Sequence, residues 1–310
     1  MIHGNCKPKF GTRLNWGNPI SQGMIGCWLF NESHGTIVYD SCNERPSGAF
    51  VNMAADVWSR GVHGASIEFN KSGGSADYIV TAPDRRFNGL NRFSAVCWVN
   101  IHAIPDANGG SVFAIPKNNK FPISPYQILF YGTKSDDSGW LAIYGNGSSR
   151  VIESGVVAVA FNVWLQVGFV YDGATLRTFI NGVPDSTSSA CTYALPTIVT
   201  NLYFGELWPG TNNASFDGFI SSIMMWNRAL STNELQYLYA YPFVMFDSQK
   251  YWTYYSSSPT PPVTYLQTKM KIGGSWKTAV PKLVKVNGVW REITDGKIKI
   301  SGDWKALTKS

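Results

Sequence analysis

The stretch Trp164–Val183, WLQVGFVYDGATLRTFINGV, decides the fold class of this chain. Two runs of mostly apolar and β-branched residues are joined at Asp172-Gly173, and Asn181-Gly182 follows the second run directly. Asp-Gly and Asn-Gly dipeptides supply the positive φ angles that tight hairpin turns require. The stretch therefore predicts consecutive antiparallel strands joined by short turns.

The second run predicts a strand with one buried side. Leu176, Thr178 and Ile180 share one face, opposite Arg177 and Phe179, as in a sandwich strand. Similar runs between turn residues predict further strands at Met24–Phe30, Thr36–Tyr39, Ser66–Phe69, Asp77–Thr81, Phe93–Ile101, Tyr126–Tyr131, Trp140–Tyr144, Trp164–Tyr171, Thr175–Ile180, Leu202–Glu206 and Phe219–Trp226.

One segment breaks the strand pattern and predicts a single short helix. Ser231 and Glu234 form a capping-box signature, Leu235 and Leu238 lie at helical spacing, and Pro242 ends the helix. We expect this helix to close the sandwich.

The last part of the chain is an internal repeat behind a Ser/Pro-rich linker. KIGGSWKTA, KVNGVWREI and KISGDWKAL align without gaps around Trp276, Trp290 and Trp304, which predicts three hairpins that pack or anchor through their tryptophans. We expect four parts: an extended N-terminal arm at 1–22, a jelly roll at 23–250, a linker at 251–264 and a basic hairpin module at 265–310.

The positive charge belongs mainly to this tail. Residues 265–310 hold ten of the 26 Lys and Arg residues but only three of the 20 Asp and Glu residues. Lysines interleaved with tryptophan allow a nucleic-acid interpretation. Alternatively, alternate lysines on one strand face protect exposed hairpin edges or dock an acidic protein surface. We favour edge protection or docking over nucleic-acid binding.

The cysteines and the apolar runs limit the cellular context. Five cysteines form an odd set without a CxxC pair, so we expect reduced thiols, with Cys27 and Cys97 buried in strands. The N-terminus has no apolar core of a secretory signal, and no run approaches the roughly 18–20 apolar residues of a membrane helix. We expect neither a secretory signal nor a membrane span.

The order of landmarks resembles the laminin-G-like, concanavalin-A-like jelly-roll superfamily, and more narrowly the laminin-G-like proteins of tailed bacteriophages. The resemblance implies two packed antiparallel sheets with ligands at loop ends or on the concave face. Short glycine–tryptophan repeats similar to the tail also end some phage tail and virion proteins. The residues that carry the resemblance are GTRLNWGNPISQGMIGCWLFNE (11–32), VYDSCNERPSGAF (38–50), WSRGVHGASIEFN (58–70), FSAVCWVNI (93–101), WLQVGFVYDGATLRTFINGV (164–183) and FDGFISSIMMWNRALSTNELQYLYAYPF (216–243).

The resemblance also implies a structural calcium ion, which many members of the superfamily carry. Asp40 keeps the first ligand position, and Asn43 is placed to supply an oxygen. The second position is Ser221 rather than Asp, and losing a carboxylate weakens a calcium site. The alternative is that Asp40 caps a turn through the nearby backbone. We therefore expect that no cofactor is required.

The carboxylates are the candidates for catalysis, and the aromatic residues near loops are the candidates for glycan contact. Glycoside hydrolysis needs two carboxylates flanking the cleaved bond, and Asp77, Glu206 and Asp217 each stand alone, so we expect no enzyme activity. Tryptophan and tyrosine near loops offer flat apolar faces to sugar CH groups. The candidates are Trp140, Tyr144 and Trp208, with burial in the core as the alternative role.

Together these features predict a bacteriophage virion accessory structural protein, of capsid-decoration or tail-fibre type, that is assembled in the host cytoplasm. Its jelly roll would bind glycans or proteins weakly. Its partners would be other virion proteins and cell-surface glycans rather than nucleic acid, in a homo-oligomer, with a trimer favoured. The alternatives are a free-standing carbohydrate-binding lectin and a degenerate glycoside hydrolase.

Overall fold

The protein divides into two compact units, Met1–Lys250 and Tyr251–Ser310, which we call the sandwich unit and the tail unit. In this computed structural model, the backbone alone is described for 45–47, 116, 128–133, 140–146, 149–154 and the tail strands. The described residues are 6–42, 45–54, 56–70, 76–104, 110–116, 128–133, 140–146, 149–154, 157–185, 188–190, 201–206, 215–246, 268–272, 275–279, 283–286, 289–292, 296–300 and 303–307.

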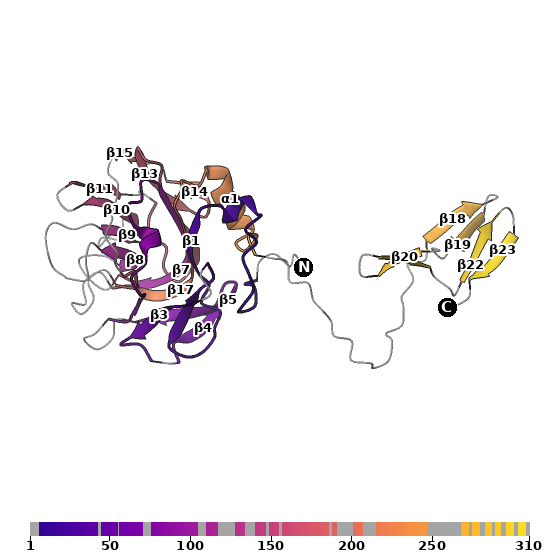
Figure 1. The fold of residues 1–310 in the computed structure, drawn as a ribbon, viewed down its shortest axis with the longest axis horizontal. Helices are drawn as coiled ribbons and strands as arrows, with labels where there is room; N and C mark the ends of the chain where they lie inside the picture. Colours follow the sequence, from indigo (N-terminus) through magenta and orange to yellow (C-terminus); the bar gives the residue numbers. More distant parts are fainter. Residues whose placement is uncertain are drawn as a thin grey trace. The chain divides into compact units, whose positions relative to one another are not determined.

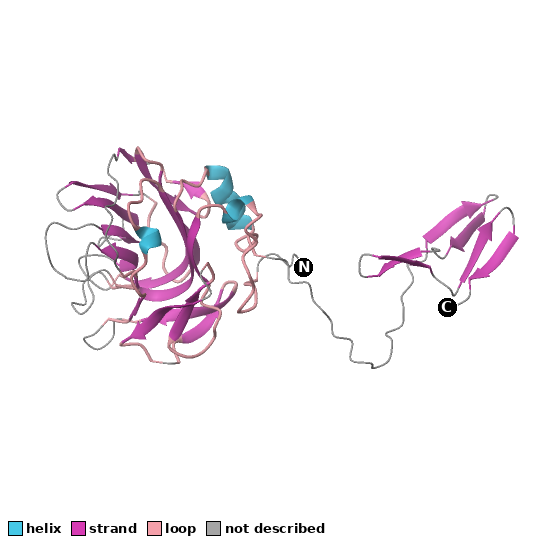
Figure 2. Ribbon diagram, viewed as in Figure 1, coloured by secondary structure: helices cyan, strands magenta, loops and turns pink. Residues whose placement is uncertain are grey.

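Strands make up most of the regular secondary structure in the described part of the sandwich unit, with one α-helix, α1 (Thr232–Ala240), and two short 3-10 helices (Figure 2). Its strands and 3-10 helices are η1 (Pro19–Ser21), β1 (Met24–Trp28), β2 (Ile37–Asp40), β3 (Arg45–Val51), β4 (Trp58–Gly61), β5 (Gly64–Phe69), β6 (Tyr78–Val80), η2 (Arg85–Phe87), β7 (Phe93–Ala103), β8 (Gly110–Pro116), β9 (Ile128–Thr133), β10 (Trp140–Asn146), β11 (Ser149–Ser154), β12 (Trp164–Tyr171), β13 (Thr175–Ile180), β14 (Val183–Pro184), β15 (Ser189–Ala190), β16 (Tyr203–Phe204) and β17 (Asp217–Trp226).

These strands form two layers, and neighbouring strands pair in antiparallel fashion (Figure 1). One layer has the order β11-β10-β9-β8-β16-β6-β3-β2. The other has the order β13-β12-β7-β17, and both β1 and the β5-β4 hairpin pair along the far edge of the long strand β17. The all-β jelly-roll prediction is confirmed, and each predicted strand segment overlaps an observed strand.

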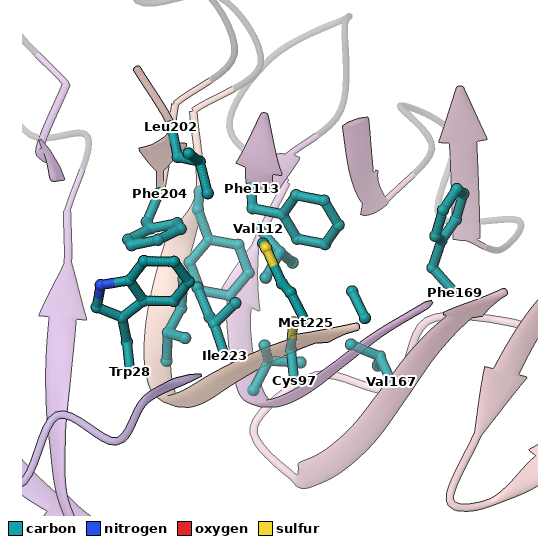
Figure 3. Close-up of a cluster of buried hydrophobic side chains, with 14 of the residues drawn as sticks. Trp28, Cys97, Val112, Phe113, Val167, Phe169, Leu202, Phe204, Ile223 and Met225 are labelled. Atoms are coloured by element: carbon teal, nitrogen blue, oxygen red, sulfur yellow. The ribbon is translucent and has the colours of Figure 1, made fainter. Parts of the chain in front are cut away.

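Aromatic and branched side chains from both layers fill the space between them (Figure 3). Trp28 of β1 and Phe204 of β16 meet edge to face with ring centroids 4.9 Å apart. Phe93 of β7 and Phe169 of β12 are 5.7 Å apart, and both are fully buried. Burial of such large rings supplies much of the stability of a sandwich core.

A second apolar cluster lies on the outer face of the β7–β17 layer. Val96 and Met224, which alternate with core residues along their strands, pack there with Leu235 and Leu238 of α1. Ser231 and Glu234 make the predicted capping box, so the expected helix is confirmed. The helix covers one end of this sheet face (Figure 1).

The two predicted turns differ in geometry. Asn181 and Gly182 both have positive φ, 52° and 75°, and join β13 to β14 as a two-residue turn. At the other turn only Gly173 has positive φ, because Asp172 Oδ1 accepts hydrogen bonds from the Ala174 and Thr175 amides. The Asp172 side chain thus stabilises a longer loop than a two-residue turn.

The described residues include four of the five cysteines and the helices that bear on a membrane span. Cys6, Cys27, Cys42 and Cys97 are free thiols, and Cys27 and Cys97 are fully buried as expected. Cys191 lies outside the described residues. Within the described part of the chain, no helix is long and apolar enough to cross a membrane.

The tail unit contains three hairpins, each forming a separate two-stranded antiparallel sheet among the described residues. In all three, the tryptophan is the second residue of the returning strand and pairs with a lysine, so the repeats share one register. The strands are β18 (Thr268–Ile272), β19 (Ser275–Ala279), β20 (Leu283–Val286), β21 (Val289–Glu292), β22 (Gly296–Ile300) and β23 (Asp303–Leu307), and the pairs are Lys271–Trp276, Lys285–Trp290 and Lys299–Trp304.

Candidate functional site

The segment before β1, residues 6–22, lies against the sandwich and includes η1, so it is not extended throughout. We call it the N-terminal arm. The Lys7 amide donates to the His63 carbonyl at 2.9 Å. The Lys7 ammonium donates to the Ser221 carbonyl at 2.6 Å and to the Ala65 carbonyl. Burial lowers the pKa of Lys7 to about 7, although the Glu32 carboxylate opposes this shift.

The docked arm forms one wall of a pocket of about 380 Å³, which we call the arm pocket. The floor and the opposite wall come from the residues that follow β1 and from the end of β2. The lining residues are Lys9, Phe10, Gly11, Thr12 and Arg13 of the arm, Leu29, Asn31 and Glu32 after β1, and Tyr39, Asp40 and Ser41. A pocket of this size, lined by a few apolar side chains and by several polar and charged ones, can hold a small ligand.

Two aromatic rings form the apolar part of the arm pocket. Phe10 is 57% exposed, so its ring is accessible to a ligand in the pocket. Its ring meets Tyr39 edge to face, with centroids 5.3 Å apart and planes at 69°. The pair presents an accessible ring next to hydrogen-bonding groups, an arrangement that suits the CH face and hydroxyl groups of a sugar.

Glu32 is the carboxylate through which the pocket can accept hydroxyl hydrogen bonds. Its Oε1 accepts from the Tyr39 amide at 2.8 Å, whereas Oε2 is buried and makes no hydrogen bond with the described residues. Burial raises the pKa of Glu32, against the backbone hydrogen bonds and the nearby Lys7 ammonium, which lower it. A buried carboxylate oxygen without a partner favours a ligand or water that donates to it.

Asp40 also lines the pocket, but its carboxylate is fully engaged within the protein. Oδ1 accepts from the amides of Cys27 and Cys42 at 2.8 and 2.9 Å, and Oδ2 accepts from the Arg86 guanidinium at 2.7 Å. Asp40 is completely buried. Burial raises its pKa, and the Arg86 charge and these hydrogen bonds oppose the rise. The Cys42 contact is the turn-capping role that we considered for Asp40 as the alternative to metal ligation.

The described residues do not fit a calcium ion held by Asp40 and position 221. Both oxygens of Asp40 already have donors, and Arg86 supplies the positive charge. Ser221 lies against Gly61, and the Lys7 ammonium binds its carbonyl oxygen. No group of three or more His, Cys, Asp or Glu residues in the described part of the chain could hold a metal ion. Asn43 lies outside the described residues.

The predicted aromatic contacts are only partly described. Trp140 and Tyr144 lie in β10, opposite Thr133 and Val151, and Trp208 lies outside the described residues. The structure therefore adds the arm pocket to these candidates. One sequence signal could have indicated this pocket, since Phe10 lies in a polar segment outside any predicted strand.

The three carboxylates that we considered as catalytic candidates lie in separate surroundings. Glu206 is buried and accepts from the Ser215 hydroxyl at 3.1 Å. Asp77 accepts from the Asn70 amide at 3.1 Å. Asp217 lies 3.6 Å from the His102 ring nitrogen.

Comparison with known proteins places the sandwich in a family. Residues 73–236, more than half of the chain, match the family model described as the concanavalin A-like lectin/glucanases superfamily. A search of curated protein sequences finds no significant match.

Solved structures with a similar fold include carbohydrate-binding domains. Domain 4 of AbnA, a GH43 extracellular arabinanase from Geobacillus stearothermophilus solved with arabinotriose, superposes with a TM-score of 0.52 at 16% identity, covering 69% of this chain and 97% of that domain. The binding domains of Paraclostridial Mosquitocidal Protein 1 and of botulinum neurotoxin serotype D/C each give a TM-score of 0.54 at 12% identity, covering 71% of this chain. This chain spans 52% of the length of each toxin domain. At these identities the likeness shows the fold alone.

Proposed function

Because the chain belongs to the concanavalin A-like lectin/glucanases superfamily, we propose that its sandwich unit is a non-catalytic glycan-binding domain. The observation that carries this proposal is the arm pocket, which the exposed Phe10 ring and the Glu32 carboxyl group line together. Stacking on the ring and hydrogen bonding to the carboxylate together recognise a sugar.

Binding fits the pocket better than hydrolysis. A glycosidase needs two carboxylates that both reach the scissile bond, one as acid and one as nucleophile or base. Of the two carboxylates in the arm pocket, Asp40 is completely buried and paired with Arg86. Glu32 alone is left to contact a ligand, so the pocket supports recognition without bond cleavage, and no cofactor is required for it.

We further propose that the protein is an accessory structural protein of a bacteriophage virion, of decoration or tail-fibre type. The support is the resemblance to laminin-G-like proteins of tailed phages and the tail unit with its three equivalent hairpins. A lone two-stranded hairpin is marginally stable in water, so hairpins of this kind gain from packing on one another or on a partner. The tail unit would anchor the protein to other virion proteins, in a symmetric oligomer that strengthens weak glycan sites.

Titration of the full chain with oligosaccharides tests glycan binding in the arm pocket. We expect an arabino-oligosaccharide or another glycan from an array to bind, and Phe10→Ala to raise its Kd by about tenfold, equivalent to about 1.4 kcal/mol. The matched control is Trp16→Ala, since Trp16 is a 49% exposed aromatic residue of the same arm outside the pocket. Equal losses in both variants, or turnover of the glycan, would refute the proposal.

Truncation before Ser256 tests the virion role. We expect the full chain to co-purify with phage particles and the truncated chain to be absent from them. A truncated chain that still assembles on particles would show that the tail unit is not the anchor. A full chain that binds glycans but never co-purifies with particles would favour a free-standing lectin.

A further inference from the structure

On the outer face of the β7–β17 layer, α1, the N-terminal arm and residues 243–246 pack over the cluster around Val96 and Met224. A row of partly exposed side chains lies outside this cluster. Trp164 of β12 pairs with Asn100 of β7, Asn100 pairs with Phe219 of β17, and Phe219 pairs with Glu68 of β5. Directly opposed residues on adjacent antiparallel strands share a sheet face. All four are partly exposed. With His102 and Asp217 we call them the sheet-face row.

The row presents three neighbouring rings. The Trp164 and Phe219 centroids are 6.2 Å apart with planes at 31°, so the two rings are tilted but broadly face the same way. His102 meets Phe219 edge to face at 4.8 Å, and the His102 side chain is 32% exposed. The row crosses four strands and therefore spans about 14 Å, three interstrand spacings. Such a platform is long enough for several rings of an oligosaccharide.

Carboxylates flank these rings. Glu68 lies directly opposite Phe219, and Asp217, whose side chain is 26% exposed, lies two residues before it on β17. Burial raises the pKa of Asp217, and the His102 ring opposes this rise. Two carboxylates repel an anionic ligand and accept hydrogen bonds from neutral hydroxyl groups.

Two amide side chains next to the rings each have one buried atom without a hydrogen-bond partner among the described residues. Asn100 Oδ1, in the middle of the row, is buried without a partner. Gln166 is only 2% exposed, and its Nε2 also has no partner. It lies two residues from Trp164 on β12 and therefore on the same face. Buried amide atoms without partners cost free energy. Because both atoms are covered, the exposed rings and carboxylates supply the ligand contacts of this face.

We propose that the sheet-face row is a second glycan-binding site, separate from the arm pocket, and that it takes neutral pyranose oligosaccharides. The rings stack on the CH faces of the sugars, and the Glu68 and Asp217 carboxylates accept from their hydroxyl groups. The site extends the proposed function to another surface of the sandwich. It rests on glycan binding but not on the arm pocket.

The test titrates the full chain with cellohexaose, maltohexaose and xylohexaose by isothermal calorimetry. At least one neutral hexasaccharide binds, and Trp164→Ala raises its Kd by about tenfold or more, while Phe10→Ala and the exposed-tryptophan control Trp16→Ala leave it within about twofold. Glu68→Gln keeps the shape of the side chain and weakens binding of the same sugar several-fold. This variant tests the site even where Trp164→Ala destabilises the fold.

The charge of the ligand gives an independent measurement. A hexuronic-acid oligomer of similar length binds the wild-type chain more weakly than the neutral sugar, and Glu68→Gln narrows this difference. Wild-type affinity in both Trp164→Ala and Glu68→Gln would overturn the sheet-face site. Loss of neutral-sugar binding in Phe10→Ala alone would also overturn it while upholding the arm pocket. If none of the hexasaccharides binds, the sheet-face site is overturned, and the arm pocket is then judged by its own titration.

Discussion

Replacing Arg86 by methionine tests whether this chain neutralises the buried Asp40 carboxylate with its own cation. The Arg86 guanidinium binds Asp40 at 2.7 Å and Asp84 at 2.6 Å, and its side chain is 28% exposed. Methionine keeps much of the apolar stem but removes the charge and the hydrogen bonds. Asp40 then stays buried with a negative charge and only two backbone donors.

The expected loss of stability at neutral pH is large. Removing one partner of a buried ion pair costs 3–5 kcal/mol, and because Arg86 is partly exposed we take about 3 kcal/mol. For a unit of this size that corresponds to a fall in Tm of roughly 6–12 °C. Asp84 contributes less, since its side chain is 24% exposed and water can replace the lost contact.

The loss should depend on pH in a defined direction. Burial raises the folded-state pKa of Asp40 above its unfolded value, so the folded state binds the proton more tightly. The carboxyl therefore destabilises the fold increasingly as pH rises from the unfolded pKa through the folded pKa. Without Arg86 the folded pKa of Asp40 rises further. The variant therefore approaches the wild type in acid, loses stability relative to it as pH rises from the wild-type folded pKa to the new one, and keeps the full deficit above that.

Thermal unfolding of the full chain between pH 4 and 8, followed by near-UV circular dichroism, measures both effects. Arg85→Met is the matched control, because Arg85 is an exposed arginine of the same 3-10 helix. The double variant Asp40→Asn with Arg86→Met should recover part of the stability, since no unpaired charge remains. A Tm equal to that of Arg85→Met at pH 7 would refute the argument. A higher wild-type Tm in calcium than in EDTA would show that calcium binds the chain.

Two further predictions concern the arm and a turn. Lys7→Met should loosen the arm, which would appear as faster hydrogen exchange over residues 6–22. Because the folded pKa of Lys7 is lowered to about 7, the stability of the docked arm in the wild type should rise between about pH 7 and 10.5. This pH dependence should vanish in the variant. Gly182→Ala should cost about 2 kcal/mol or more by denaturant unfolding, because φ is +75° and the new Cβ would lie 2.9 Å from the Gln236 Cα. Gly35→Ala, at φ +81° with nothing within 4 Å, should cost only about 1 kcal/mol, and equal costs would rule out the steric argument.

The sequence predicted those elements whose signals are local. The Asn181-Gly182 turn, the capped helix α1 and the buried strands β7 and β12 each carry their pattern within a few residues. The same patterns did not mark β3, β4, β8 or β11. In β3 the run RPSGAFV contains Pro and Gly and has weak strand propensity, and it forms because β2 and β6 pair with it on both sides.

The candidate sites were less predictable than the fold. The sequence singled out Asp40, but its engagement by Arg86 depends on η2 folding back onto the end of β2. In the sequence, Asp217 stands apart from the other carboxylates, whereas in the structure it lies beside His102, whose ring contacts Phe219. A search for catalytic spacing along one strand cannot detect residues that meet across strands.

The sequence alone determined that this chain is an all-β sandwich with a repeat tail, because alternation, turn dipeptides and a regular tryptophan period act over short distances. Only the tertiary structure decided where the candidate binding sites lie. The arm pocket exists because Lys7 ties the arm to β5 and β17, bringing Phe10 against Tyr39. The sheet-face row exists because four strands from distant parts of the chain pair in one register. Register and docking arise from packing over the whole sandwich, which no local stretch of sequence encodes.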